Sequence, residues 1–181
     1  CDAVPPALAF FISPHGLGHA ARAAALIDEL HRRRPQLRFV LFTGAPEWFF
    51  RGSLSAPFEY VAMEVDVGFV QRTATEEDLE ATVAALARIY PPRRATVTRA
   101  ARLIAERRCL GVVCDIAPLG LAVAAAAGVP GILGENFTWD WIYEAYERAC
   151  PQLGDYRALL VEMFQGADLH IQATPICRSA P

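Results

Sequence analysis

Residues 10–22 hold the side chains whose types and spacing are best suited to chemistry, in the run FFISPHGLGHAAR. His19 follows the second glycine of this run and falls in the first turn of an expected helix. The positive end of a helix disfavours imidazolium, so His19 would stay a neutral base. A neutral imidazole at a ligand cleft can take the proton of a hydroxyl nucleophile. His19 is therefore the candidate catalytic base; the alternative is that it only caps the turn or bonds a neighbouring loop.

The same run fits the spacing G-x-G-x-x-A, with Gly16 and Gly18 as its glycines. Glycine lets backbone N–H groups approach an anion at a helix N-terminus, although many tight strand-to-helix turns need glycine as well. Arg22 lies one turn further on and either holds a phosphate or is a structural arginine, and His15 could line the same cleft. A dinucleotide site is disfavoured, because residues 43–46 read TGAP and lack the acid that would bind the ribose.

Two later segments carry polar side chains directly after apolar runs. Asp115 ends the run CLGVVCD, and it either orients the imidazole of His19 or caps the helix that follows Pro118. Residues 134–143 read GENFTWDWIY. In this second segment an asparagine can bind a hydroxyl or amide, the tryptophans can form a sugar-stacking wall or part of the core, and an aspartate can start a helix. The candidate ligand-binding residues there are Glu135, Asn136, Trp139 and Asp140.

These segments are positioned by a sheet, because short apolar runs alternate with helical stretches. The expected strands cover residues 8–13, 37–43, 58–63, 110–115, 129–135 and 167–173. The expected helices cover 19–33, 75–90, 93–108, 119–128, a region from 139 and another around 155–165. The helix over 75–90 opens on a capping-box pattern of Thr75 and Asp78. Apolar strands that alternate with helices predict an α/β fold: an open, doubly wound, mostly parallel sheet of about six strands.

Ligands of such sheets bind beyond the carboxyl ends of the strands, where the strand order reverses. With the common order 3-2-1-4-5-6, the first and fourth strands are neighbours at that point and the fifth comes next. The loops after these three strands carry His19, Asp115 and Asn136. We therefore expect three segments that are distant in the sequence to converge on one edge of the sheet.

The composition excludes several functions. All 17 basic residues are arginine, and without lysine the chain cannot form a P-loop, a Schiff base or a protein-kinase site of its own. The net charge of −3 gives no basic excess for a nucleic acid. No apolar run reaches the roughly 18 residues of a transmembrane segment. The five cysteines lack CxxC or zinc spacing, which predicts no metal site and a reducing, cytoplasmic location.

The runs HGLGHAAR, DIAPLGLAVAAAAGVPGIL and ENFTWDW together resemble the N-terminal half of glycosyltransferases of the GT-B fold, which is built from two Rossmann-like domains. They look like the branch that contains the glycosyltransferase of peptidoglycan lipid-intermediate synthesis. They are closer still to the glycosyltransferase-like segment of plant arabinokinases, over residues 8–175. The resemblance implies metal-independent transfer of a sugar from a nucleotide-diphosphate donor, such as a UDP-sugar, to a hydroxyl acceptor, with no cofactor.

By this resemblance, Gly16, Gly18 and His19 form the acceptor or phosphate loop, and Asn136 faces the cleft. We expect residues 1–181 to form a single acceptor-side domain without the C-terminal nucleotide-binding domain, so that this chain alone would be inactive. The partners would be a sugar acceptor, a nucleotide-sugar donor and the missing domain. The alternatives are a non-catalytic sugar or sugar-phosphate binding module, fused to or associated with another enzyme, and half of a sugar-nucleotide epimerase.

Overall fold

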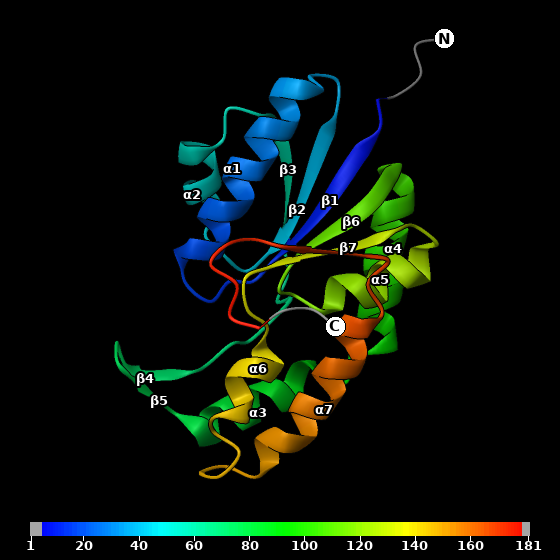
Figure 1. Cartoon of the computed structure of the whole chain (residues 1–181). Coiled ribbons are helices and arrows are strands. Elements are labelled where there is room, and N and C mark those ends of the chain that lie inside the picture. The colour runs from blue at the N-terminus through cyan, green and yellow to red at the C-terminus, as the bar shows by residue number, and fades with distance from the viewer. Residues whose placement is uncertain (1–4, 179–181) are drawn as a thin grey trace.

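A six-stranded parallel sheet forms the centre of the computed structural model, which describes residues 5–178 (Figure 1). The strand order is β3-β2-β1-β6-β7-β8, and every neighbouring pair is parallel. The strands are β1 (Ala7–Ile12), β2 (Arg38–Thr43), β3 (Phe58–Ala62), β6 (Cys109–Asp115), β7 (Gly131–Glu135) and β8 (Leu169–Gln172). The predicted fold class is confirmed. Counted along this sheet alone, the strands have the expected order 3-2-1-4-5-6, in which the first and fourth strands are neighbours.

Helices cover both faces of the sheet, and a further group lies beyond the carboxyl ends of its strands (Figure 1). Parallel strands need crossover connections, which place helices on the faces. One face carries α1 (Leu17–Arg33) and α2 (Glu47–Ser53), and the other carries α4 (Arg94–Glu106) and α5 (Leu119–Ala127). The group beyond the strand ends consists of α3 (Leu79–Ile89), α6 (Trp139–Glu144) and α7 (Gln152–Gln165).

Alternate side chains of the central strands fill two cores, as the two-residue period of a strand requires. Phe11 of β1 stacks on Phe42 of β2, with ring centroids 4.5 Å apart, on the face that α4 and α5 cover. Phe10 points to the opposite face and packs in the cluster that α1 supplies. A third cluster joins α3, α6 and α7 around Tyr143 and Ile116, so it supports the loops at the carboxyl edge from beyond the sheet.

The segment between β3 and α3 differs from the sequence expectation. Residues 71–77 form an antiparallel hairpin of β4 (Gln71–Thr73) and β5 (Glu76–Glu77), which projects from the molecule in Figure 1. The helix begins only at Leu79, and Asp78 is its N-cap, accepting a 2.9 Å hydrogen bond from the amide of Ala81. The predicted capping box at Thr75 was therefore wrong: Asp78 alone satisfies an orphan amide at the helix start.

Within residues 5–178, no helix combines the length and the apolar character that crossing a membrane requires.

Candidate functional site

The carboxyl edge of the sheet brings His19 against Asp115. His19 lies in the first turn of α1, and Asp115 is the last residue of β6. Nδ1 of His19 lies 2.7 Å from Oδ1 of Asp115, and the two residues are only 8% and 6% exposed. An ionised carboxylate can only accept, so Nδ1 carries the hydrogen of this bond and the lone pair of the neutral ring is left on Nε2. The pair thus has the geometry of an imidazole oriented by a carboxylate.

Arg22 fixes this carboxylate from its other side. Its Nε donates to Oδ2 of Asp115 at 2.8 Å, and its Nη2 donates to Oδ1 at 2.6 Å. Its Nη1 donates to Oδ1 of Asn136 at 2.6 Å, just beyond the end of β7. A two-pronged arginine contact holds a carboxylate in one plane, which a lysine could not do. We call these four residues the His19 cluster: His19, Arg22, Asp115 and Asn136.

The sequence left two alternative roles open for Arg22 and two for Asp115, and these contacts bear on both choices. The guanidinium of Arg22 is engaged by Asp115 and Asn136, so the structural alternative fits it better than the phosphate-binding one. Asp115 contacts His19 and does not cap the following helix, because α5 has Pro118 at its N-cap and no side-chain capping bond.

The backbone turns sharply directly after Asp115. Ile116 has φ of +45°, in the left-handed region that a β-branched side chain rarely adopts, and it is fully buried. An antiparallel bridge to Ile12 and a 3.2 Å bond from the amide of Ser13 to the carbonyl of Asp115 hold this turn in place. Strain of this kind costs on the order of 1–3 kcal/mol and is typical of functional sites. Here the strained residue directly follows the carboxylate that contacts His19 of α1.

The glycine loop leaves the start of α1 open. Gly16 is the N-cap with φ of +79°, and α1 has neither a side-chain capping bond nor an acidic residue in its first turn. A Cβ on Gly16 or Gly18 would meet nothing within 4 Å. The first amides of α1 are thus close to open space at the positive end of a long helix, where an anion is favoured. The predicted phosphate-binding role of this loop stays a prediction.

Asp66 is a buried acid beneath this loop that the sequence analysis missed. It is 2% exposed, and its Oδ2 accepts from the Ser13 hydroxyl at 2.7 Å and from the Trp139 indole at 2.5 Å. Its Oδ1 lies 3.4 Å from the hydroxyl of Tyr90. Burial raises the pKa of Asp66 to about 6, although the bonds from Ser13 and Trp139 act in the opposite direction. The available signal was a lone acid in the otherwise apolar run at 65–70.

His15 packs beside this network. Its ring meets Trp139 edge-on, with centroids 4.9 Å apart. Burial, together with the nearby His19, lowers the pKa of His15, so its neutral form is favoured. Gly68 makes this packing possible, because a Cβ there would lie 2.5 Å from Cδ2 of His15.

Three other predicted residues make no hydrogen bond to the His19 cluster among the described contacts. Glu135 is 3% exposed and lies within electrostatic range of Arg22, but its Oε1 is 2.7 Å from Nε2 of His170 on β8. Asp140 is 6% exposed and lies 3.4 Å from Arg178. Trp139 is 2% exposed and part of the third core cluster. Their burial favours supporting roles over direct contact with a ligand.

An imidazole held by a carboxylate thus lies beside the open amides of α1, which suits deprotonation of a hydroxyl beside an anionic group. Among the described residues, no group of three His, Cys, Asp or Glu side chains is arranged to hold a metal ion.

Comparisons with known proteins show which fold the chain has. No family model matches the chain. Over 148 residues it is 31% identical to an L-arabinokinase of Arabidopsis thaliana, a match covering 78% of this chain but only 14% of that protein. The structure is similar to MurG of Acinetobacter baumannii, with a TM-score of 0.56, 13% identity and coverage of 97% of this chain and 44% of MurG. It is also similar to the glycosyltransferase SsfS6 of Streptomyces sp. SF2575, with a TM-score of 0.53, 13% identity and coverage of 94% and 51%. The chain thus spans about half of these structures or less, and its fold is that of the N-terminal half of the GT-B glycosyltransferases.

Proposed function

We propose that this chain is the acceptor-side domain of a glycosyltransferase that moves a sugar from a nucleoside-diphosphate donor to a hydroxyl group. The observation that carries the proposal is the 2.7 Å contact of His19 with a carboxylate that Arg22 holds on its other side. Because the nucleotide is expected to bind mainly to the C-terminal half of this fold, a complete enzyme would need a second domain beyond residues 1–181.

In the proposed step, Nε2 of His19 takes the proton of the acceptor hydroxyl. The hydroxyl oxygen attacks the anomeric carbon of the donor sugar, and the bond from that carbon to the diphosphate oxygen breaks. The leaving nucleoside diphosphate keeps the electron pair of that bond. Asp115 stabilises the imidazolium that forms, as a carboxylate does in a catalytic triad. The open amides of α1 offer hydrogen bonds to phosphate charge.

The test is transfer by the natural protein that contains this chain, measured as release of UDP from UDP-sugars with a panel of sugar acceptors. His19→Ala should lower kcat by about a hundredfold or more, since a positioned general base contributes at least that much. Asp115→Asn should lower kcat with little change in KM, because it acts on the imidazole and not on the substrate. His31→Ala is the matched control, since His31 lies at the other end of the same helix. Normal rates for His19→Ala would refute the assignment.

A second candidate is a sugar or sugar-phosphate binding module that is fused to or associated with another enzyme. It is favoured by the match to an L-arabinokinase, of which the chain spans only 14%. This alternative predicts saturable binding of a sugar or sugar phosphate without consumption of a nucleotide-sugar donor. Transfer that depends on His19 would exclude it.

A further inference from the structure

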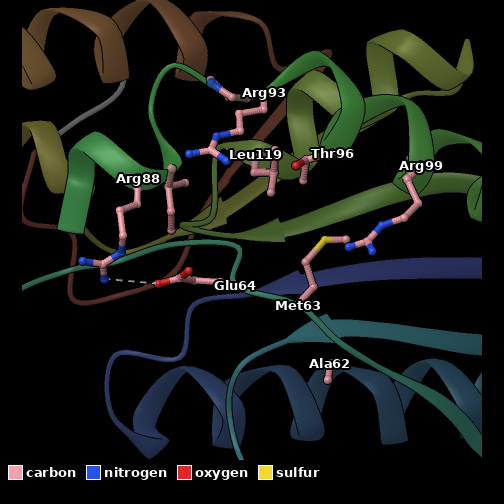
Figure 2. Close-up of a pocket in the computed structure, with 10 residues that line it drawn as sticks. Ala62, Met63, Glu64, Arg88, Arg93, Thr96, Arg99 and Leu119 are labelled. Atoms are coloured by element: carbon pink, nitrogen blue, oxygen red, sulfur yellow. Dashed lines mark ion pairs between the residues drawn. The ribbon is translucent and has the colours of Figure 1, made fainter.

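A second polar cavity lies away from the His19 cluster. It has a volume of about 420 Å³ and is bounded by the segment after β3 on one side and by the ends of α3 and α4 on the other (Figure 2). Figure 2 shows Met63 and Glu64 on the β3 side, Arg88 on the α3 side, and Arg93 and Arg99 on the α4 side. We call this cavity the arginine pocket.

The charge of the arginine pocket is strongly one-sided. Its ionisable lining residues are the three arginines and Glu64, which leaves a net positive charge of two. Glu64 makes only a loose pair with Arg88, at 3.9 Å between nitrogen and oxygen, and both side chains are more than half exposed. Within residues 5–178, no ion pair or hydrogen bond engages the guanidinium of Arg93 or Arg99. Two arginine forks are therefore available to a ligand with several oxygens.

The start of α4 adds neutral donors to the same pocket. Arg93 is the N-cap of α4, which has no side-chain capping bond and no acidic residue in its first turn. Thr96, also in this turn, lines the pocket with its hydroxyl. The first amides of a helix lack intrahelical acceptors and favour an anion. The helix start, the hydroxyl and the arginines all offer donors, and Glu64 alone among the ionisable lining groups opposes them.

The pocket continues toward the candidate active site. A second, more open hollow of about 540 Å³ shares Met63, Glu64 and Arg88 with the arginine pocket. Its other end is lined by Pro14 and Gly44, which follow the carboxyl ends of β1 and β2. Because the two hollows share these lining residues, they form one groove. It runs from Pro14, where the loop that leads into His19 begins, to the arginines.

We propose that the arginine pocket binds the phosphate group of a phosphorylated sugar that serves as the acceptor. A phosphate monoester carries close to two negative charges near neutral pH, which matches the excess positive charge of the pocket, and its oxygens suit arginine forks and helix amides. The sugar ring would lie in the shared groove, with its free hydroxyl toward the glycine loop. This assignment of the acceptor rests on the proposed transferase function, whereas the phosphate site itself does not.

The test is titration of the chain with inorganic phosphate at constant ionic strength, followed by calorimetry and by amide NMR shifts. Arg93→Gln and Arg99→Gln should each weaken phosphate binding by about tenfold, since each removes a charge-assisted hydrogen-bond donor. Arg94→Gln and Arg102→Gln are matched controls, because they remove the same charge from the same helix outside the pocket. Equal losses in the controls, or no saturable binding, would overturn the proposal.

A second arm separates a phosphorylated sugar from free phosphate. Glucose 6-phosphate should displace inorganic phosphate and shift the amides of residues 62–64 as well as those at the start of α4, whereas glucose should displace none. If glucose 6-phosphate fails to displace phosphate, the sugar part of the proposal is wrong. Phosphate binding is measured without any transfer reaction, so failure of the proposed transfer chemistry and failure of the pocket are distinguishable.

Discussion

Replacing Asp66 by asparagine should change how the stability of the domain depends on pH. Asparagine has nearly the same shape, and its amide oxygen can accept the hydrogen bonds from Ser13 and Trp139. Its NH2 group can donate to the hydroxyl of Tyr90, the third partner. The substitution therefore keeps the side-chain hydrogen bonds of the network and removes the titration of a buried acid.

The magnitude follows from the pKa of Asp66, which burial raises from 3.8 to about 6. Between these two values the native state holds a proton that the unfolded chain has released. The free energy of unfolding therefore falls as the pH rises through this window and is level above it. One pKa unit corresponds to about 1.4 kcal/mol, so ionised Asp66 costs about 3 kcal/mol at pH 7. Little of this cost is present at pH 4, and the Asp66→Asn variant lacks all of it.

The assay is urea denaturation of the wild-type chain and of the variant at pH 4, 5, 6 and 7, followed by circular dichroism. The free energy of unfolding of the variant, relative to the wild type, should increase by about 2 kcal/mol between pH 4 and pH 7. Asp28→Asn is an informative control with the opposite sign. Desolvation acts to raise the pKa of Asp28, but hydrogen bonds from the amide of Ala56 and from the hydroxyl and amide of Ser55 outweigh it, so the pKa is lowered. Replacing Asp28 should therefore reduce the free energy of unfolding most at neutral pH.

A difference between the Asp66 variant and the wild type that stays constant from pH 4 to pH 7 would refute the reasoning, because it would mean that Asp66 titrates near its ordinary value. A variant that loses stability as the pH rises would refute it more strongly. That result would mean that the ionised carboxylate, with its hydrogen bonds from Ser13 and Trp139, stabilises the fold.

Three further outcomes are expected. Gly68→Ala should destabilise the domain by about 1–3 kcal/mol in urea denaturation, since the new Cβ would meet His15 at 2.5 Å at a φ of +64°; Gly52→Ala, in a helix with open space, should not. Cys177 should react with a maleimide while the chain is folded and Cys114 should not, because Cys114 is buried and its pKa is raised; mass spectrometry of the labelled peptides reads this directly. Ser13→Ala should cost about 1–3 kcal/mol at neutral pH by leaving the buried aspartate with one hydrogen bond fewer.

The sheet was predictable because its strands carry the signal along their own length. The continuous apolar runs around Phe11 and Val113 are buried, as expected for central strands. The strand order then followed from the preference for one doubly wound topology. The meeting of His19 with Asp115 and Asn136 depended only on which strand ends are neighbours, and the structure brings these loops together.

What the sequence did not reveal depends on contacts between side chains that no local pattern encodes. Asp66 gives no periodic signal, and its role follows only from the positions of Ser13 and Trp139, which are 53 and 73 residues away. The link of Arg22 to Asp115 is of the same kind, since an arginine one turn after His19 equally fits a phosphate contact. The hairpin at 71–77 was missed because a short polar segment has no hydrophobic face to mark its strands.

The spacing of the His19 cluster along the chain has a consequence for how the domain acquires its site. Its hydrogen bonds connect residues that are 93, 96 and 114 positions apart. Closing loops of that length precedes any gain from the contacts, so such contacts form late compared with local helices. During synthesis the site cannot be completed before Asn136 has left the ribosome, when most of the sheet is already available. The site is thus completed only after five of the six strands of the sheet have been synthesised, and partly folded chains in which His19 has not met Asp115 lack this carboxylate contact.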